Sequence, residues 1–61
     1  MAKLTEKELA FITELIGLEQ NAMAKAEFYS KNCNCAEVCV VMDEIAKKHQ
    51  ARIEKLTSKL N

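Results

Sequence analysis

The sequence predicts an all-α protein, a two-helix antiparallel hairpin that forms a four-helix bundle by homodimerisation. Apolar residues recur at helical spacing in two long segments, and a short Ser- and Asn-containing break separates them. Proline is absent and Gly17 is the single glycine, so the sequence lacks the residues that usually separate strands and form tight β-turns. A short connection between two long helices makes them antiparallel neighbours. We expect residues 1–61 to form one helical hairpin, with helix one over about 5–30, a turn at 31–34 and helix two over about 35–60.

The first helix has a clear start and an unusually wide apolar surface. Thr5 followed by Glu8 is typical of a capping box, in which each side chain accepts a bond from a free backbone N–H of the first turn. Phe11, Leu18 and Tyr29 widen the apolar stripe on one flank beyond the ~100° that one packing partner covers. The stripe itself consists of Leu9, Ile12, Leu15, Ile16, Ala22, Met23 and Ala26.

The second helix follows the break at residues 30–34, where Ser and Asn favour turn geometry. Asn34 with Glu37 gives a weaker N-cap signature, and we expect Asn34 to cap this helix. Its apolar face is predicted to contain Cys35, Val38, Cys39, Met42, Ile45, Ala46, Ile53, Leu56 and Leu60.

Chain length is the reason to expect a partner. A chain of 61 residues buries a small share of its unfolded surface, and such chains gain stability from disulfides, metals or association. Two helices alone share one contact surface and leave the apolar flanks of each helix in water, whereas two paired hairpins cover these flanks. The predicted partner is therefore a second copy of the chain. Gly17 either permits close approach of another helix or is tolerated in mid-helix at a cost of about 1 kcal/mol.

Charge and hydropathy exclude two classes of partner. Nine basic and nine acidic residues balance, so no basic surface for nucleic acid is predicted. The basic residues near the C-terminus suit the negative end of a helix dipole instead. No apolar stretch approaches the roughly 20 residues that span a bilayer, and residues 1–8 contain no hydrophobic signal region. We expect an intracellular, cytoplasmic protein whose cysteines are reduced thiols.

Glu19 and His49 are ionisable residues at the centres of the two apolar stripes. In an antiparallel hairpin with its turn near residue 33, Glu19 falls roughly opposite Ala46, less than one turn from His49. Burying a carboxylate without a partner costs free energy, so the placement of Glu19 and His49 in the apolar stripes requires an explanation. One is a metal site, since bundle cores build such sites from inward Glu and His. The other, which we favour, is a hydrogen-bonded pair that fixes register.

Cys33, Cys35 and Cys39 form a second group, at the turn and the start of helix two. Cys35 and Cys39 are four residues apart and would share a helical face, with Cys33 folded over them from the loop. Thiolates bind soft metals, so a metal or redox site is one interpretation. The other, slightly favoured, is that Cys35 and Cys39 are small core residues and Cys33 is a loop thiol. No phosphate-binding glycine loop or activated nucleophile is present, and no small-molecule substrate is indicated.

Two segments resemble a known family. Residues 19–29, EQNAMAKAEFY, resemble the first helix of ferritin-like and rubrerythrin-like bundles, and residues 45–56, IAKKHQARIEKL, are similar to the second. The chain also resembles short spore-coat-associated proteins of endospore-forming Firmicutes. The resemblance implies that Glu19 matches the first-helix metal ligand. His49 and Arg52, however, occupy the positions of a Glu ligand and a His ligand, and an arginine cannot ligate metal. Loss of the di-iron centre is therefore expected.

Three functional hypotheses follow. The first is a non-enzymatic, ferritin-like half-bundle that dimerises and acts in assembly, located in the cytoplasm or within the spore or its coat. The second is a metal-binding protein, with a soft metal on Cys33, Cys35 and Cys39 or iron at a degenerate Glu19/His49 site. The third, least favoured, is a redox enzyme whose site the dimer completes. No cofactor is required by the first hypothesis, which we favour.

Overall fold

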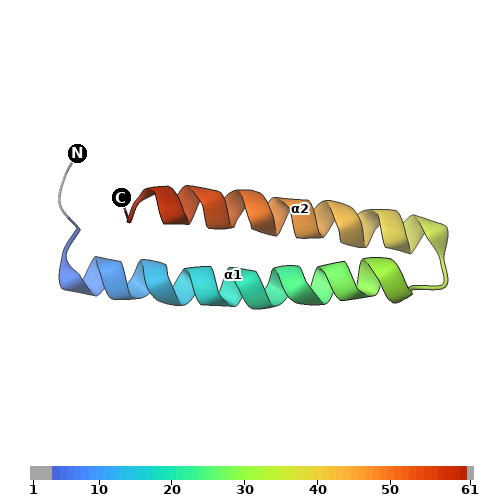
Figure 1. Cartoon of the computed structure of the whole chain (residues 1–61), viewed down its shortest axis with the longest axis horizontal. Coiled ribbons are helices and arrows are strands. Elements are labelled where there is room, and N and C mark those ends of the chain that lie inside the picture. Colours follow the sequence, from blue (N-terminus) through green and yellow to red (C-terminus); the bar gives the residue numbers. More distant parts are fainter. Residues whose placement is uncertain (1–3, 61) are drawn as a thin grey trace.

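The computed structural model describes residues 4–60 as two helices and no strand. Helix α1 spans Glu6–Asn32 and helix α2 spans Ala36–Ser58. They run antiparallel, side by side along their lengths, and a tight turn joins them at one end (Figure 1). The prediction of an all-α chain with two helices is confirmed. Residues 1–3 and 61 of the predicted hairpin lie outside the described residues.

The capping box predicted for α1 is present. The backbone N–H of Glu8 donates to the Thr5 hydroxyl (3.0 Å), and the backbone N–H of Thr5 donates to the Glu8 carboxylate (2.9 Å). The backbone bond from Thr5 also lowers the pKa of Glu8, because it stabilises the charged carboxylate. Two donors that would lack partners at a free helix start are thereby satisfied.

α1 continues two residues beyond its predicted end at residue 30, because polar side chains bond back to its last turns. The Ser30 hydroxyl donates to the Glu27 carbonyl (2.7 Å), and the Asn32 amide donates to the Phe28 carbonyl (2.8 Å). The reversal is therefore confined to residues 33–35.

The prediction that Asn34 caps α2 is wrong. The N-cap is Cys35, whose extended backbone precedes the helix and whose side chain makes no capping bond. Because α1 runs to Asn32, Asn34 lies in the middle of the reversal, and the first α2 bond runs from Cys39 N to Cys35 O (3.0 Å).

The seam between the helices is narrow. Within residues 4–60 only Ala26 and Ala46 are buried, each 5% exposed. Leu9 and Val38 of the predicted stripes are exposed, because one neighbouring helix covers a smaller arc than the apolar arc each helix presents. Leu60 is also exposed, and it lies beyond the end of α2. The half-buried residues of the seam include Ile12, Leu15, Ile16, Glu19, Ala22 and Met23 of α1, and Met42, Ile45, His49, Ile53 and Leu56 of α2.

The hairpin is a single layer with a large apolar surface. Its principal extents are 46 × 17 × 11 Å, so both broad faces are open. Large hydrophobic residues are exposed along both helices and just outside their ends, namely Leu4, Leu9, Phe11, Leu18, Phe28, Tyr29, Val38, Val40, Val41 and Leu60. Neither helix, over the described residues, has an apolar stretch long enough to cross a membrane.

Candidate functional site

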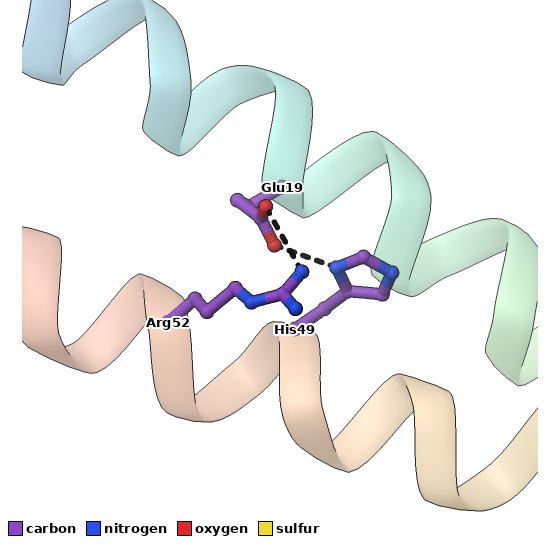
Figure 2. A network of polar contacts seen from close by, with 3 residues as sticks. All are labelled: Glu19, His49 and Arg52. Atoms are coloured by element: carbon purple, nitrogen blue, oxygen red, sulfur yellow. Dashed lines mark hydrogen bonds and ion pairs between the residues drawn. The ribbon is translucent and has the colours of Figure 1, made fainter.

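The carboxylate of Glu19 and the imidazole of His49 meet at the middle of the helix pair. The Nδ1 atom of His49 lies 2.6 Å from Oε2 of Glu19, and the two side chains point toward one another across the seam (Figure 2). The contact between these residues, expected from their positions on the two stripes, is confirmed. The Glu19 side chain is 21% exposed and that of His49 is 17% exposed, so water reaches only a small part of the pair.

Arg52 completes a three-residue network (Figure 2). Its Nη1 atom lies 3.6 Å from Oε1 of Glu19, the carboxylate oxygen that His49 does not contact. Arg52 follows His49 by three residues, so both side chains leave the same side of α2 and converge on one carboxylate. The Arg52 side chain is 59% exposed, so Arg52 is the most exposed member of the network.

The network holds Glu19 in its charged form. The hydrogen bond from His49 lowers the pKa of Glu19, and the positive charges of His49 and Arg52 lower it further against the opposing effect of desolvation. A carboxylate within an apolar seam is thus compensated by donors on the facing helix. The arrangement links one position of α1 to one position of α2, as expected of a pair that fixes the register of the hairpin.

The same arrangement bears on the predicted metal sites. Both Glu19 oxygens already face donors, and Arg52 provides a fixed positive charge where a metal would bring its own. Within residues 4–60, no three His, Cys, Asp or Glu side chains are grouped so that they could hold a metal ion. The metal roles of Glu19 and His49 stay predictions.

A groove beside the network was not predicted. It has a volume of about 290 Å³, opens on one broad face, and is lined by Leu15, Glu19, Arg52, Lys55 and Leu56. Its floor is apolar and its α2 rim is basic. The sequence signal was available, because Leu15 and Leu18 flank Glu19 on α1 and the cations recur at three-residue spacing on α2.

The cysteines are arranged differently from the prediction. Cys33 and Cys39 form a disulfide with a Cα–Cα distance of 5.8 Å, and Cys35 is a free, exposed thiol. The expectation of three reduced thiols is therefore wrong. The expectation that Cys35 and Cys39 share one helical face is also wrong, because Cys35 precedes α2 and its backbone is extended. The structure brings Cys33 and Cys39 together, and three thiolates for a soft metal would exist only after reduction.

Comparison with known proteins returns no family model, no curated protein and no solved structure that matches the chain. The ferritin-like likeness rests on the two segments 19–29 and 45–56. The structure places one residue of each segment, Glu19 and His49, in contact.

Proposed function

We propose that the chain is a non-enzymatic, ferritin-like half-bundle that acts in assembly by pairing with a second copy. Two hairpins would pack face to face as a four-helix bundle. The proposed setting is the spore or its coat, for which the support is the sequence resemblance.

The observation that carries the proposal is the amount of surface left exposed. The hairpin exposes 5029 Å². A monomeric globular protein of 6.9 kDa exposes roughly 4,000 Å² by the usual scaling with mass. The excess of roughly 1,000 Å² is close to the ~800 Å² that each partner buries in a standard protein interface. One further copy therefore accounts for the excess.

The two broad faces differ, which indicates the face that pairs. Phe11, Leu18 and Tyr29 are separated by 7 and 11 residues, so they lie on one side of α1. On α2, Val41 precedes the groove residue Arg52 by 11 residues, or about three helical turns, so Val41 borders the same face. We call these four residues and the apolar groove between the helices the Leu18 face.

The opposite face is more polar. Its groove is lined by Glu27, Ser30, Lys31, Asp43, Ala46, Lys47 and Gln50, whereas the groove of the Leu18 face has Leu15 and Leu56 as its floor. Leu9 lies on this polar side, about 180° around α1 from Leu18. Pairing through the Leu18 face removes more apolar surface from water and leaves more charged groups hydrated.

A second copy is the partner favoured by charge and shape. The chain has no net charge, so two copies do not repel each other through their overall charge. A C2 pair buries the same patch on both subunits, so a single apolar face is sufficient to close the assembly. The Glu19–His49–Arg52 network would then set the register of each half.

Native mass spectrometry of the full chain, purified without oxygen or chelator, tests the proposal. The expected species is a metal-free dimer. A dimer carrying a stoichiometric metal would favour the metal-binding alternative. The added mass would identify the metal, and loss of that metal in Glu19→Leu or in a triple Cys→Ser variant would assign its ligands. A monomer at every concentration would contradict assembly through a second copy.

A further inference from the structure

The disulfide lies at the tip of the hairpin, and the proposed pairing through the Leu18 face makes no use of it. Cys33 follows the end of α1, and Cys39 lies in the first turns of α2, so the bond closes a loop of seven residues across the reversal. The stabilisation that a disulfide provides increases with the length of the loop it closes, so this short loop gains less than a long one would. Residues 33–35 also join the two helices directly, and α1 and α2 pack against each other along their lengths.

The surroundings of the two sulfur atoms suit the reduced form as well as the oxidised form. The Sγ atom of Cys33 lies 3.7 Å from the carbonyl oxygens of Ser30 and of Cys35, and Sγ of Cys39 lies 3.7 Å from the carbonyl oxygen of Cys33. Each thiol, once formed, therefore has a backbone acceptor within reach without a change of fold. Both cysteines are only half-buried, so a small sulfur compound can approach them.

We propose that Cys33 and Cys39 form a reversible dithiol–disulfide site whose substrates are low-molecular-weight thiols and disulfides of the glutathione type. In oxidation, one protein thiolate attacks a sulfur of the small disulfide and releases one small thiolate. The second protein thiolate then attacks the mixed disulfide at the protein sulfur, closes the Cys33–Cys39 bond and releases the second small thiol. Two electrons pass from the protein to the small disulfide, and the two protein thiol protons end on the two small thiols. Reduction by two small thiols is the reverse.

The test is a redox titration of the full chain in mixtures of reduced and oxidised glutathione, followed by acid quench, alkylation and intact mass measurement. Two forms are expected, with one and with three alkylated cysteines, and their ratio should follow the glutathione ratio. Helical content by circular dichroism should be the same in both forms. Three alkylated cysteines in every mixture would mean that the bond does not form and would overturn the proposal. A bond that survives fully reduced glutathione, or a loss of helix on reduction, would overturn it by making the bond structural.

Cys35 provides the matched control, since it is free and exposed beside the pair. The Cys35→Ser variant should show the same transition, now between no alkylated cysteine and two. The Cys39→Ser variant should lose it. If Cys35→Ser abolishes the transition and Cys39→Ser retains it, the exchanging pair is not Cys33 and Cys39. Dimerisation is measured separately, so failure of the redox site leaves the assembly proposal standing.

Discussion

Replacing Leu18 by alanine should weaken the dimer strongly without harming the hairpin. Leu18 is 58% exposed in the single hairpin, so more than half of its surface is available to a second copy. The change removes three carbons at about 0.8 kcal/mol each when buried, which gives about 1.4 kcal/mol per chain after scaling by the exposed fraction. Both copies lose it, so the dimer should lose about 3 kcal/mol, a weakening of roughly 100-fold in Kd. Alanine is a good helix former, so α1 itself is preserved.

Leu9→Ala is the matched control, because it makes the same chemical change in the same helix on the opposite face. Leu9 is 46% exposed. Sedimentation equilibrium over a range of concentrations gives Kd for both variants, and circular dichroism confirms that both remain helical. The Leu9 variant should dimerise like the unmodified chain. An unchanged Kd in Leu18→Ala, or a larger effect of Leu9→Ala, would refute pairing through the Leu18 face.

Three further outcomes are expected in thermal melts followed by circular dichroism. Gly17→Ala should stabilise the chain by about 0.5–1 kcal/mol, a rise of several °C, because an added Cβ meets no atom within 4 Å and glycine disfavours helix. A lower Tm would show that a second chain packs closely on Gly17. Thr5→Ala should cost about 1 kcal/mol because the bond from the Glu8 backbone N–H to the Thr5 hydroxyl is lost, although the Thr5 backbone N–H can still donate to Glu8. Thr13→Ala in mid-helix should not destabilise. Because the folded pKa of Glu19 lies below the ordinary 4.5, its stabilising contribution is present above that pH and is lost as pH falls through the folded value. Acidification from pH 6 to 3 should therefore lower the Tm of the unmodified chain more than the Tm of Glu19→Gln. A Glu14→Gln control should behave like the unmodified chain. Equal falls in Tm for all three proteins would contradict a stabilising role for the network.

The contact between Glu19 and His49 was predictable because two regularities determine it. Helical periodicity places each residue at the centre of an apolar stripe, and a short turn fixes the antiparallel register. Errors of one or two residues at the turn shift this register by less than one helical turn, which a long side chain can bridge. The sequence shows that Arg52 cannot bind a metal, but only the side-chain geometry shows that Arg52 contacts Glu19.

The cysteine arrangement was not predictable because it depends on single-residue details of the turn. Residues four apart share a helical face only when both lie within the helix, and α2 begins one residue after Cys35. The start of α2 in turn depends on how far α1 extends, which the back-bonding of Ser30 and Asn32 decides. Residue type and spacing alone do not determine where such a reversal places its sulfur atoms.

The most direct test of assembly through a second copy is the concentration dependence of the melting temperature of the full chain. Association stabilises the folded state by mass action, so Tm should rise with concentration. With an unfolding enthalpy of about 0.7 kcal/mol per residue in each chain of the dimer, a hundredfold increase in concentration should raise Tm by roughly 10 °C. A Tm that does not change over this range would contradict a hairpin stabilised by pairing.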